Sequence, residues 1–147
     1  MVVSELIHRP PKLAPLWRVL LFGGGASLAA LLVVAATLKP SQRGYGTHQQ
    51  LGLPPCTFVM LLGHRCPACG MTTAWAHLVR AQPIAALRAN VGGALLGLAA
   101  IVLAPWLLAS AMRGRWLGHA PSDRVVLGVA LALVLVTVID WGIRFLW

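Results

Sequence analysis

The chain has 147 residues and a net charge of +9, and 59% of its residues are hydrophobic while only 10% are charged. Soluble domains carry about 25% charged residues, so this composition, with a mean hydropathy of +0.80, indicates a membrane protein. The carboxylates are few and far apart in the sequence, which argues against catalysis by paired carboxylates: Glu5, Asp123 and Asp140. The basic residues flank apolar runs instead of forming one patch, which argues against nucleic-acid binding and favours contact with lipid headgroups.

Three apolar segments are long enough to cross a bilayer, at residues 19–38, 89–112 and 125–143. About twenty residues with a rise of about 1.5 Å each span the roughly 30 Å hydrocarbon core. Arginine or lysine brackets every segment, and Asp140 is the charged residue inside the last one. We therefore predict an all-α membrane protein, a single membrane domain over residues 1–147 with three transmembrane helices.

The first segment also has a feature of a signal peptide, because Val34-Ala35-Ala36 resembles a cleavage site. Its apolar stretch exceeds the roughly 7–15 residues of a signal-peptide core, so we expect a retained helix. Glycines at 23–25, 92, 93 and 97 would let the spanning helices approach closely. Tryptophans near the segment ends are typical interfacial anchors: Trp17, Trp116, Trp141 and Trp147.

A shorter apolar run at residues 51–62 opens a segment, 51–80, that carries all three cysteines. Pro54 and Pro55 lie inside this run, and proline resists the interior of a helix. Twelve helical residues would also reach only about 18 Å, less than the thickness of the bilayer core. We predict a re-entrant or interfacial cysteine-containing segment between the first and second transmembrane helices.

The distribution of basic residues predicts an orientation in the membrane. With three crossings, the amino-terminal tail and the 113–124 loop share one side, where basic residues are denser than on the other side. Because positive residues favour the cytoplasmic side, we expect the amino terminus inside and the cysteine segment outside.

The cysteine motif reads Cys66-Pro67-Ala68-Cys69-Gly70 and precedes a stretch, 71–80, that reads as a helix. Proline suits the first turn of a helix, so we expect Cys66 at or near the N-cap, where the helix dipole stabilises a thiolate. One face of this helix would carry residues three or four positions apart: Cys66, Cys69, Thr73 and His77. His77 would lie about 12 Å beyond Cys69, too far to share a metal ion. We favour a histidine at the membrane interface, where polar-tipped side chains settle readily, over one that acts on a substrate bound along this face.

Cys56 lies ten residues before Cys66, and His64 lies two residues before it. The connecting loop is short enough to bring the three thiols together, and a Cys3His set is an ordinary structural zinc site. The spacing C-x9-C-x2-C differs from that of a standard zinc finger, so a disulfide and hydrophobic packing stay open as alternatives. The candidate ligands of zinc or another thiophilic metal are Cys56, His64, Cys66 and Cys69.

Asp140 lies within the third segment, four residues before Arg144. A carboxylate inside a membrane is a candidate functional group. The i,i+4 spacing places both side chains on one helix face, however, so we expect an ion pair near the membrane interface.

The stretch LPPC…HRCPACGMTTAW resembles a family of small bacterial membrane proteins described as domain of unknown function 2752. That family carries a C-P-x-C-G-x-T-R-A core with an earlier cysteine, which correspond here to residues 66–74 and Cys56. The resemblance extends over roughly residues 45–105, and it implies a multi-pass protein of the bacterial cytoplasmic (inner) membrane with a cysteine site but no established reaction. Two positions depart from the family, since Thr73 replaces the arginine and Asn90 precedes Val91 instead of proline.

Three functions compete at this point. We prefer a binding or accessory module whose cysteines hold a metal or a disulfide and whose helices dock to a larger membrane complex or to a second copy. The second is a membrane thiol–disulfide oxidoreductase with Cys66 as the nucleophile and Cys69 or Cys56 as the resolving thiol. The third is a carrier that passes a soft ion such as Cu(I) between thiolates. In each case the partners are lipid and membrane protein, not nucleic acid.

Overall fold

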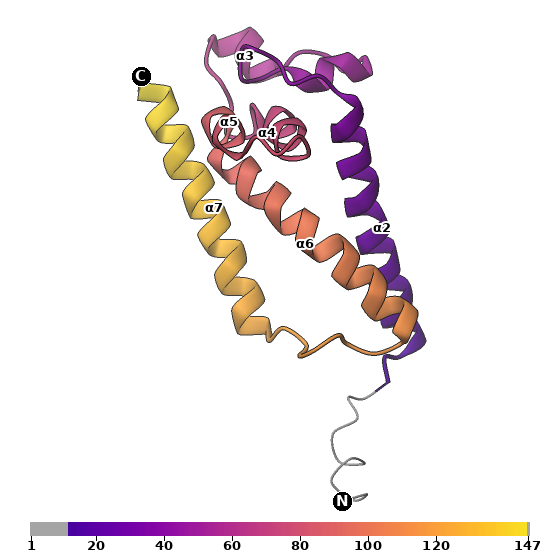
Figure 1. Cartoon of the computed structure of the whole chain (residues 1–147). Coiled ribbons are helices and arrows are strands. Elements are labelled where there is room, and N and C mark those ends of the chain that lie inside the picture. Colours follow the sequence, from indigo (N-terminus) through magenta and orange to yellow (C-terminus); the bar gives the residue numbers. More distant parts are fainter. Residues whose placement is uncertain (1–11, 147) are drawn as a thin grey trace, which may run out of the picture.

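The computed structural model describes residues 12–146, and within that range it is helical without any strand. The elements in chain order are α2 (Pro15–Thr37), η1 (Thr47–Leu51), α3 (Thr57–Leu62), α4 (Met71–Leu78), α5 (Pro83–Ala89), α6 (Val91–Arg113) and α7 (Asp123–Leu146). The long helices are α2, α6 and α7, and Figure 1 shows the short ones gathered at one end. This architecture confirms the predicted fold class, while Trp147, one of the expected anchors, lies outside the described residues.

The helices α2, α6 and α7 are long and apolar enough to cross a membrane, with 23, 23 and 24 residues. At about 1.5 Å per residue, such helices reach about 35 Å, enough for a bilayer core of about 30 Å. The predicted spans agree with these helices to within a few residues. α2 begins earlier than expected because Pro15 occupies its first turn, where the missing amide is not needed. α6 begins at Val91 because Asn90 caps it.

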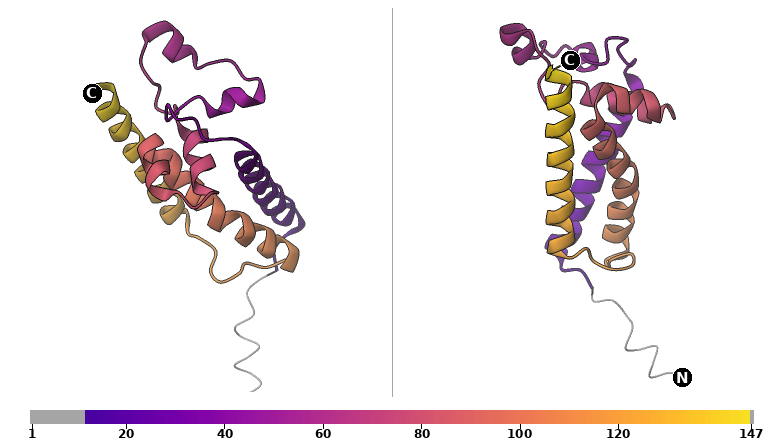
Figure 2. Two further views of the ribbon diagram at one scale, coloured as in Figure 1. Left: turned by 45° about the horizontal axis from the view of Figure 1, so that its top comes forward. Right: turned by 90° about the vertical axis from the view of Figure 1, so that its left-hand side faces the viewer.

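α2 and α6 lie side by side in opposite directions (Figures 1 and 2). Gly25 makes this close approach possible, because a Cβ there would lie 2.8 Å from Cγ of Leu108 and 3.1 Å from the Ala104 carbonyl oxygen. Small residues allow transmembrane helices to pack closely where the hydrophobic effect does not drive them together. A Cβ at Gly23 would meet no atom within 4 Å, so the close contact expected of the α2 glycines rests on Gly25.

Two arginines hold the ends of the α2–α6 pair. At one end, Arg80 donates through Nη1 and Nη2 to the carbonyls of Ala35 and Ala36 in α2, at 3.3 and 2.9 Å. At the other end, Nε of Arg18 donates to the carbonyl of Ala111 in α6, at 3.1 Å. The last carbonyls of a helix lack partners within it, and a cation there also interacts favourably with the helix dipole. Each arginine therefore completes the end of a neighbouring helix.

Arg80→Gln is expected to lower the free energy of unfolding by about 1–3 kcal/mol, since hydrogen bonds from a charged donor contribute about that much. Arg88→Gln, a matched change at an exposed arginine of α5, is expected to have little effect. Titration with a denaturing detergent, followed by loss of helical circular dichroism, compares the two variants. Equal losses would contradict the capping role of Arg80.

The short helices lie at one end of the bundle, between the end of α2 and the start of α6 (Figures 1 and 2). α4 and α5 pack on each other and on α6 around a small core: Ala74, Leu78, Ala86, Ala89 and Ala94. α3 has six residues and reaches about 9 Å, so the 51–62 run does not span a membrane. The cysteines lie between the first and second long helices, as the sequence predicts.

α7 packs against α6 and has no buried residue along its length. The contact includes Gly92 of α6, where a Cβ would overlap the side chain of Thr137. The last turns of α7 carry Trp141 and Arg144, which contact the cysteine segment. α7 is therefore attached to the protein mainly at the end where the cysteines lie.

Candidate metal centre

The three cysteines of the chain meet at the end of the bundle. Their Sγ atoms all lie within 4.8 Å of one another. The Sγ atoms of Cys66 and Cys69 are 3.1 Å apart, and all three thiols are free. In a tetrahedral zinc site with Zn–S bonds of about 2.3 Å, the sulfurs lie about 3.8 Å apart. Shifts of about 1 Å would therefore bring these sulfurs to metal-binding distances.

Cys66 and Cys69 lie in a turn that precedes α4. A hydrogen bond of 3.0 Å from the Cys69 amide to the Cys66 carbonyl closes this turn. α4 begins only at Met71, with Gly70 as its N-cap. The prediction that Cys66 lies at or near the N-cap, with Pro67 in the first helical turn, is therefore wrong, because the N-cap lies four residues later.

The helical face predicted for Cys66, Cys69, Thr73 and His77 does not form, since α4 carries only the last two of them. Nδ1 of His77 lies 2.7 Å from Oε1 of Gln82, beyond the helix end. Oγ1 of Thr73 lies 2.8 Å from Oγ1 of Thr47, and both threonines are fully buried. Where the family resemblance led us to expect an arginine, this chain has a threonine that ties α4 to η1.

Gly70 adopts a backbone conformation that the turn requires. Its φ is +96°, a left-handed value that favours glycine. A Cβ at this position would lie 2.5 Å from the carbonyl oxygen of Ala89 and 2.8 Å from that of Gly44. The cysteine turn thus lies directly against two other stretches of backbone, which leaves no room for a side chain.

Asn90 connects the cysteine turn to the start of α6. Its side chain is fully buried, and its Nδ2 donates to the carbonyls of Pro67 and Cys69, at 2.9 and 3.1 Å. Its Oδ1 accepts a hydrogen bond of 2.6 Å from the amide of Gly93, as an N-cap does. The amide of Met71 bonds to the carbonyl of Ala68, so the i→i+4 bond that a helix would form to the Pro67 carbonyl is absent.

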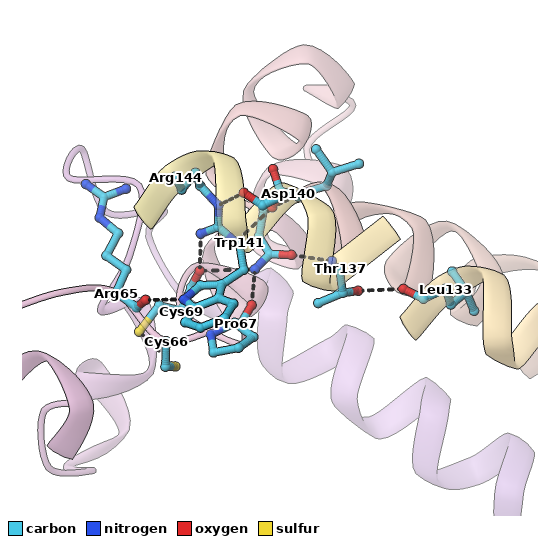
Figure 3. Close-up of polar contacts among 12 residues, drawn as sticks. Arg65, Cys66, Pro67, Cys69, Leu133, Thr137, Asp140, Trp141 and Arg144 are labelled. Atoms are coloured by element: carbon cyan, nitrogen blue, oxygen red, sulfur yellow. Dashed lines mark hydrogen bonds and ion pairs between the residues drawn. The ribbon is translucent and has the colours of Figure 1, made fainter. Parts of the chain in front are cut away.

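Side chains of α7 contact the same turn (Figure 3). Nε1 of Trp141 donates to the carbonyl of Arg65, at 2.7 Å, and Nη1 of Arg144 donates to that of Cys69, at 3.2 Å. Arg144 also pairs with Asp140, at 2.7 Å, which confirms the ion pair predicted from their spacing. Trp141, expected only as a membrane anchor, thus has a polar partner in the cysteine segment.

His64 does not join the three thiols in this structure. Its side chain is exposed, and its ring lies against that of Phe145 in α7, with centroids 4.5 Å apart. Of the four candidate ligands, the structure therefore brings together Cys56, Cys66 and Cys69.

A cavity of about 320 Å³ opens beside the thiols, and all three cysteines line it together with His48, Gln49 and Thr73. A tetrahedral ion held by three protein ligands keeps one coordination position open. The cavity gives such a position room for a further ligand.

Two of the thiols differ strongly in acidity. Hydrogen bonding to the backbone of Val59 lowers the pKa of Cys56 to about 7, because such bonds favour the charged form. Burial raises the pKa of Cys69 to about 12, because a thiolate is poorly solvated there. Of these two, Cys56 is the thiol that ionises near neutral pH.

Comparison with curated proteins and with solved structures finds no match for the chain. A family model described as "Protein of unknown function (DUF2752)" matches residues 56–104. This stretch begins at Cys56, includes both other cysteines and Asn90, and ends within α6. The match confirms the resemblance predicted from the cysteine motif, and over residues 56–104 the chain is similar to that uncharacterised family.

Proposed function

We propose that the chain is a small multi-pass membrane protein that binds one thiophilic metal ion through Cys56, Cys66 and Cys69. The observation that carries this proposal is the convergence of three free thiol sulfurs within 4.8 Å. Thiolates are soft ligands that favour Zn²⁺ and Cu(I) over harder cations. The turn that carries Cys66 and Cys69 is also tied to α6 through the buried Asn90, which is how proteins orient metal ligands.

A binding or accessory role in the membrane fits this site better than a role in acid–base catalysis. The whole sequence holds only three carboxylates, and Asp140 is engaged by Arg144. α7 has no buried residue, so its apolar surface is available to lipid and to a larger membrane complex or a second copy. In this proposal the amino terminus lies in the cytoplasm, and the protein resides in the cytoplasmic membrane of a bacterium.

The protein purified anaerobically in mild detergent is expected to hold about one equivalent of zinc or copper per chain. Cys66→Ser and Cys69→Ser together are expected to remove it, because two of the three thiolates are lost. Elemental mass spectrometry of the full chain measures the content.

His64→Ala provides the control for this measurement, since His64 lies against Phe145 and not in the thiol cluster. That variant is expected to keep the metal. A wild-type chain without metal after incubation with Zn²⁺ or Cu(I) would overturn the proposed function, and so would a double serine variant that binds as much metal as the wild type.

A thiol–disulfide oxidoreductase is the second candidate, favoured by the 3.1 Å separation of the Cys66 and Cys69 sulfurs. In this reaction one thiolate of the cluster attacks a substrate disulfide, and a mixed disulfide forms as a substrate thiolate leaves and takes a proton from water. A second cysteine then attacks the mixed disulfide and releases the other substrate thiol. Two electrons pass from the chain to the substrate, and the chain is left with a disulfide. The low pKa of Cys56 makes it a better first nucleophile than Cys69, whose pKa burial raises to about 12.

In the reduced, metal-free chain, alkylation of Cys56 by iodoacetamide is expected to accelerate as the pH rises through about 7, because the thiolate is the reactive form. Cys69, with its pKa of about 12, is expected to stay largely unmodified over the same range. Mass spectrometry of peptides alkylated at a series of pH values distinguishes the two thiols. Faster modification of Cys69 than of Cys56 at neutral pH would contradict this order.

A further inference from the structure

The end of α7 contacts the cysteine segment through the polar groups of Trp141 and Arg144. Trp141 and Arg144 donate to carbonyls at residues 65 and 69, on either side of the turn that carries two of the thiols. We propose that Trp141 and Arg144 are positioning residues of the thiol site, which hold the turn so that its sulfurs face Cys56. This inference rests on the proposed metal-binding function.

Arg144 is itself held in place before it reaches the turn. Its Nη2 lies 2.7 Å from Oδ2 of Asp140, and its Nε donates to the Asp140 carbonyl, at 3.3 Å. The same carboxylate oxygen accepts from the amide of Val91 at the start of α6, at 3.4 Å. A planar guanidinium fixed on one edge presents its remaining N–H groups in a set direction, and here Nη1 meets the carbonyl of Cys69 (Figure 3).

Trp141 connects α7 to both stretches of chain that carry the thiols, the one with Cys56 and the one with Cys66 and Cys69. Its indole N–H binds the carbonyl of Arg65, the residue before Cys66. Its ring meets that of Phe58 edge to face, with centroids 6.3 Å apart, and Phe58 follows Cys56 by two residues. One side chain of α7 thus touches the segment that supplies the first thiol and the segment that supplies the other two.

The carbonyl of Cys69 receives two donors, Nδ2 of Asn90, which lies between α5 and α6, and Nη1 of Arg144 in α7. Rotation of this peptide would move the Cys69 side chain and break both bonds. The charged donor is the stronger of the two by type, and it belongs to an arginine that is also paired with Asp140. The Asp140–Arg144 pair, which also contacts the start of α6 through the Val91 amide, thereby helps to fix the thiol turn.

The test uses the full chain in detergent and Co²⁺ as the probe. Arg144→Gln removes the guanidinium, and Trp141→Phe removes the indole N–H while it keeps an aromatic ring. Arg18→Gln is the matched control, because Arg18 also donates to a distant backbone carbonyl, that of Ala111, but at the opposite end of the α2–α6 pair. The measurements are Co²⁺ affinity in competition with a chelator, and the intensity of the thiolate-to-cobalt charge-transfer absorption per bound ion.

Both α7 variants are expected to bind Co²⁺ about 10–100-fold more weakly, as loss of outer contacts to metal ligands does, with a weaker thiolate absorption. Arg144→Lys, which keeps a cation beside Asp140, is expected to recover part of the affinity. Arg18→Gln is expected to match the wild type. Wild-type affinity and absorption in both α7 variants would overturn the proposal, and so would an equal loss in Arg18→Gln, which would indicate general destabilisation.

A second readout separates failure of this proposal from failure of the proposed function. If the wild-type chain binds no Co²⁺, the proposed metal-binding function is wrong. Alkylation of the metal-free chain still tests whether Trp141 and Arg144 position the turn. Cys69 is buried, with 7% of its surface exposed, and release of the turn should make it accessible. Faster alkylation of Cys69 in both α7 variants but not in Arg18→Gln supports positioning, and unchanged alkylation overturns it.

Discussion

Gly70→Ala is expected to lower the free energy of unfolding by more than about 3 kcal/mol. It is also expected to move the thiols of Cys66 and Cys69 away from that of Cys56. A residue other than glycine at a φ of +96° adds strain of about 1–3 kcal/mol. The new Cβ would also lie 2.5 Å from the Ala89 carbonyl oxygen and 2.8 Å from that of Gly44. Both are backbone atoms, so relief requires the turn to move away from the end of α5.

Gly63→Ala is the matched control for this change. Gly63 also has a positive φ, of +70°, but no atom lies within 4 Å of its Cβ position, so this variant bears the backbone strain without the overlap. It is expected to lose about 1 kcal/mol. Detergent titration followed by circular dichroism measures both free energies of unfolding, and equal values would show that the close approach at Gly70 contributes nothing.

Replacement of Asn90 is the second change with a large expected effect. Asn90→Ala removes an N-cap, which costs about 0.5–2 kcal/mol, and takes a donor from the part-buried Pro67 carbonyl and the buried Cys69 carbonyl, which costs about 1–3 kcal/mol. We therefore expect a loss of about 2–4 kcal/mol in the free energy of unfolding. Faster alkylation of Cys69 should accompany it, because its carbonyl loses one of two partners.

Asn90→Ser distinguishes the two roles of this side chain. Serine is also a good N-cap, so it should preserve the bond to the Gly93 amide. It cannot supply the two N–H donors that reach Pro67 and Cys69. The serine variant is expected to retain more stability than the alanine variant but to expose Cys69 as much, and full protection of Cys69 in Asn90→Ser would refute the anchoring of the turn by the amide.

The long helices could be predicted from the sequence because their signals are local. A run of about twenty apolar residues between charged residues predicts a transmembrane helix by itself, whatever the rest of the chain contains. The same holds for the Asp140–Arg144 pair, whose members are one helical turn apart. The start of α6 after Asn90 could also have been predicted, because an asparagine before an apolar run is a typical helix N-cap.

The details of the site depended on contacts between distant residues. The prediction of a helix start at Cys66 relied on Pro67, yet α4 begins only at Met71, and the turn before it is bound by Asn90, which is 23 residues from Pro67. His64 is close to Cys66 in sequence, but Phe145 provides a stacking partner 81 positions later. Trp141 and Arg144 lie 76 and 75 residues from the carbonyls that they bind, and no periodicity within a segment reports on such pairings.

The contact of Arg80 with the end of α2 has a consequence for the order in which the protein assembles during synthesis. The carbonyls of Ala35 and Ala36 receive their side-chain donor from Arg80, which follows them by 45 and 44 residues. In a nascent chain that has inserted only α2, these two carbonyls can therefore accept hydrogen bonds only from water or lipid headgroups. That end is completed by the protein only after the ribosome has made the cysteine segment and α4. The thiol-bearing segment is thus part of the junction that joins the first two spanning helices, rather than a loop added to a finished pair.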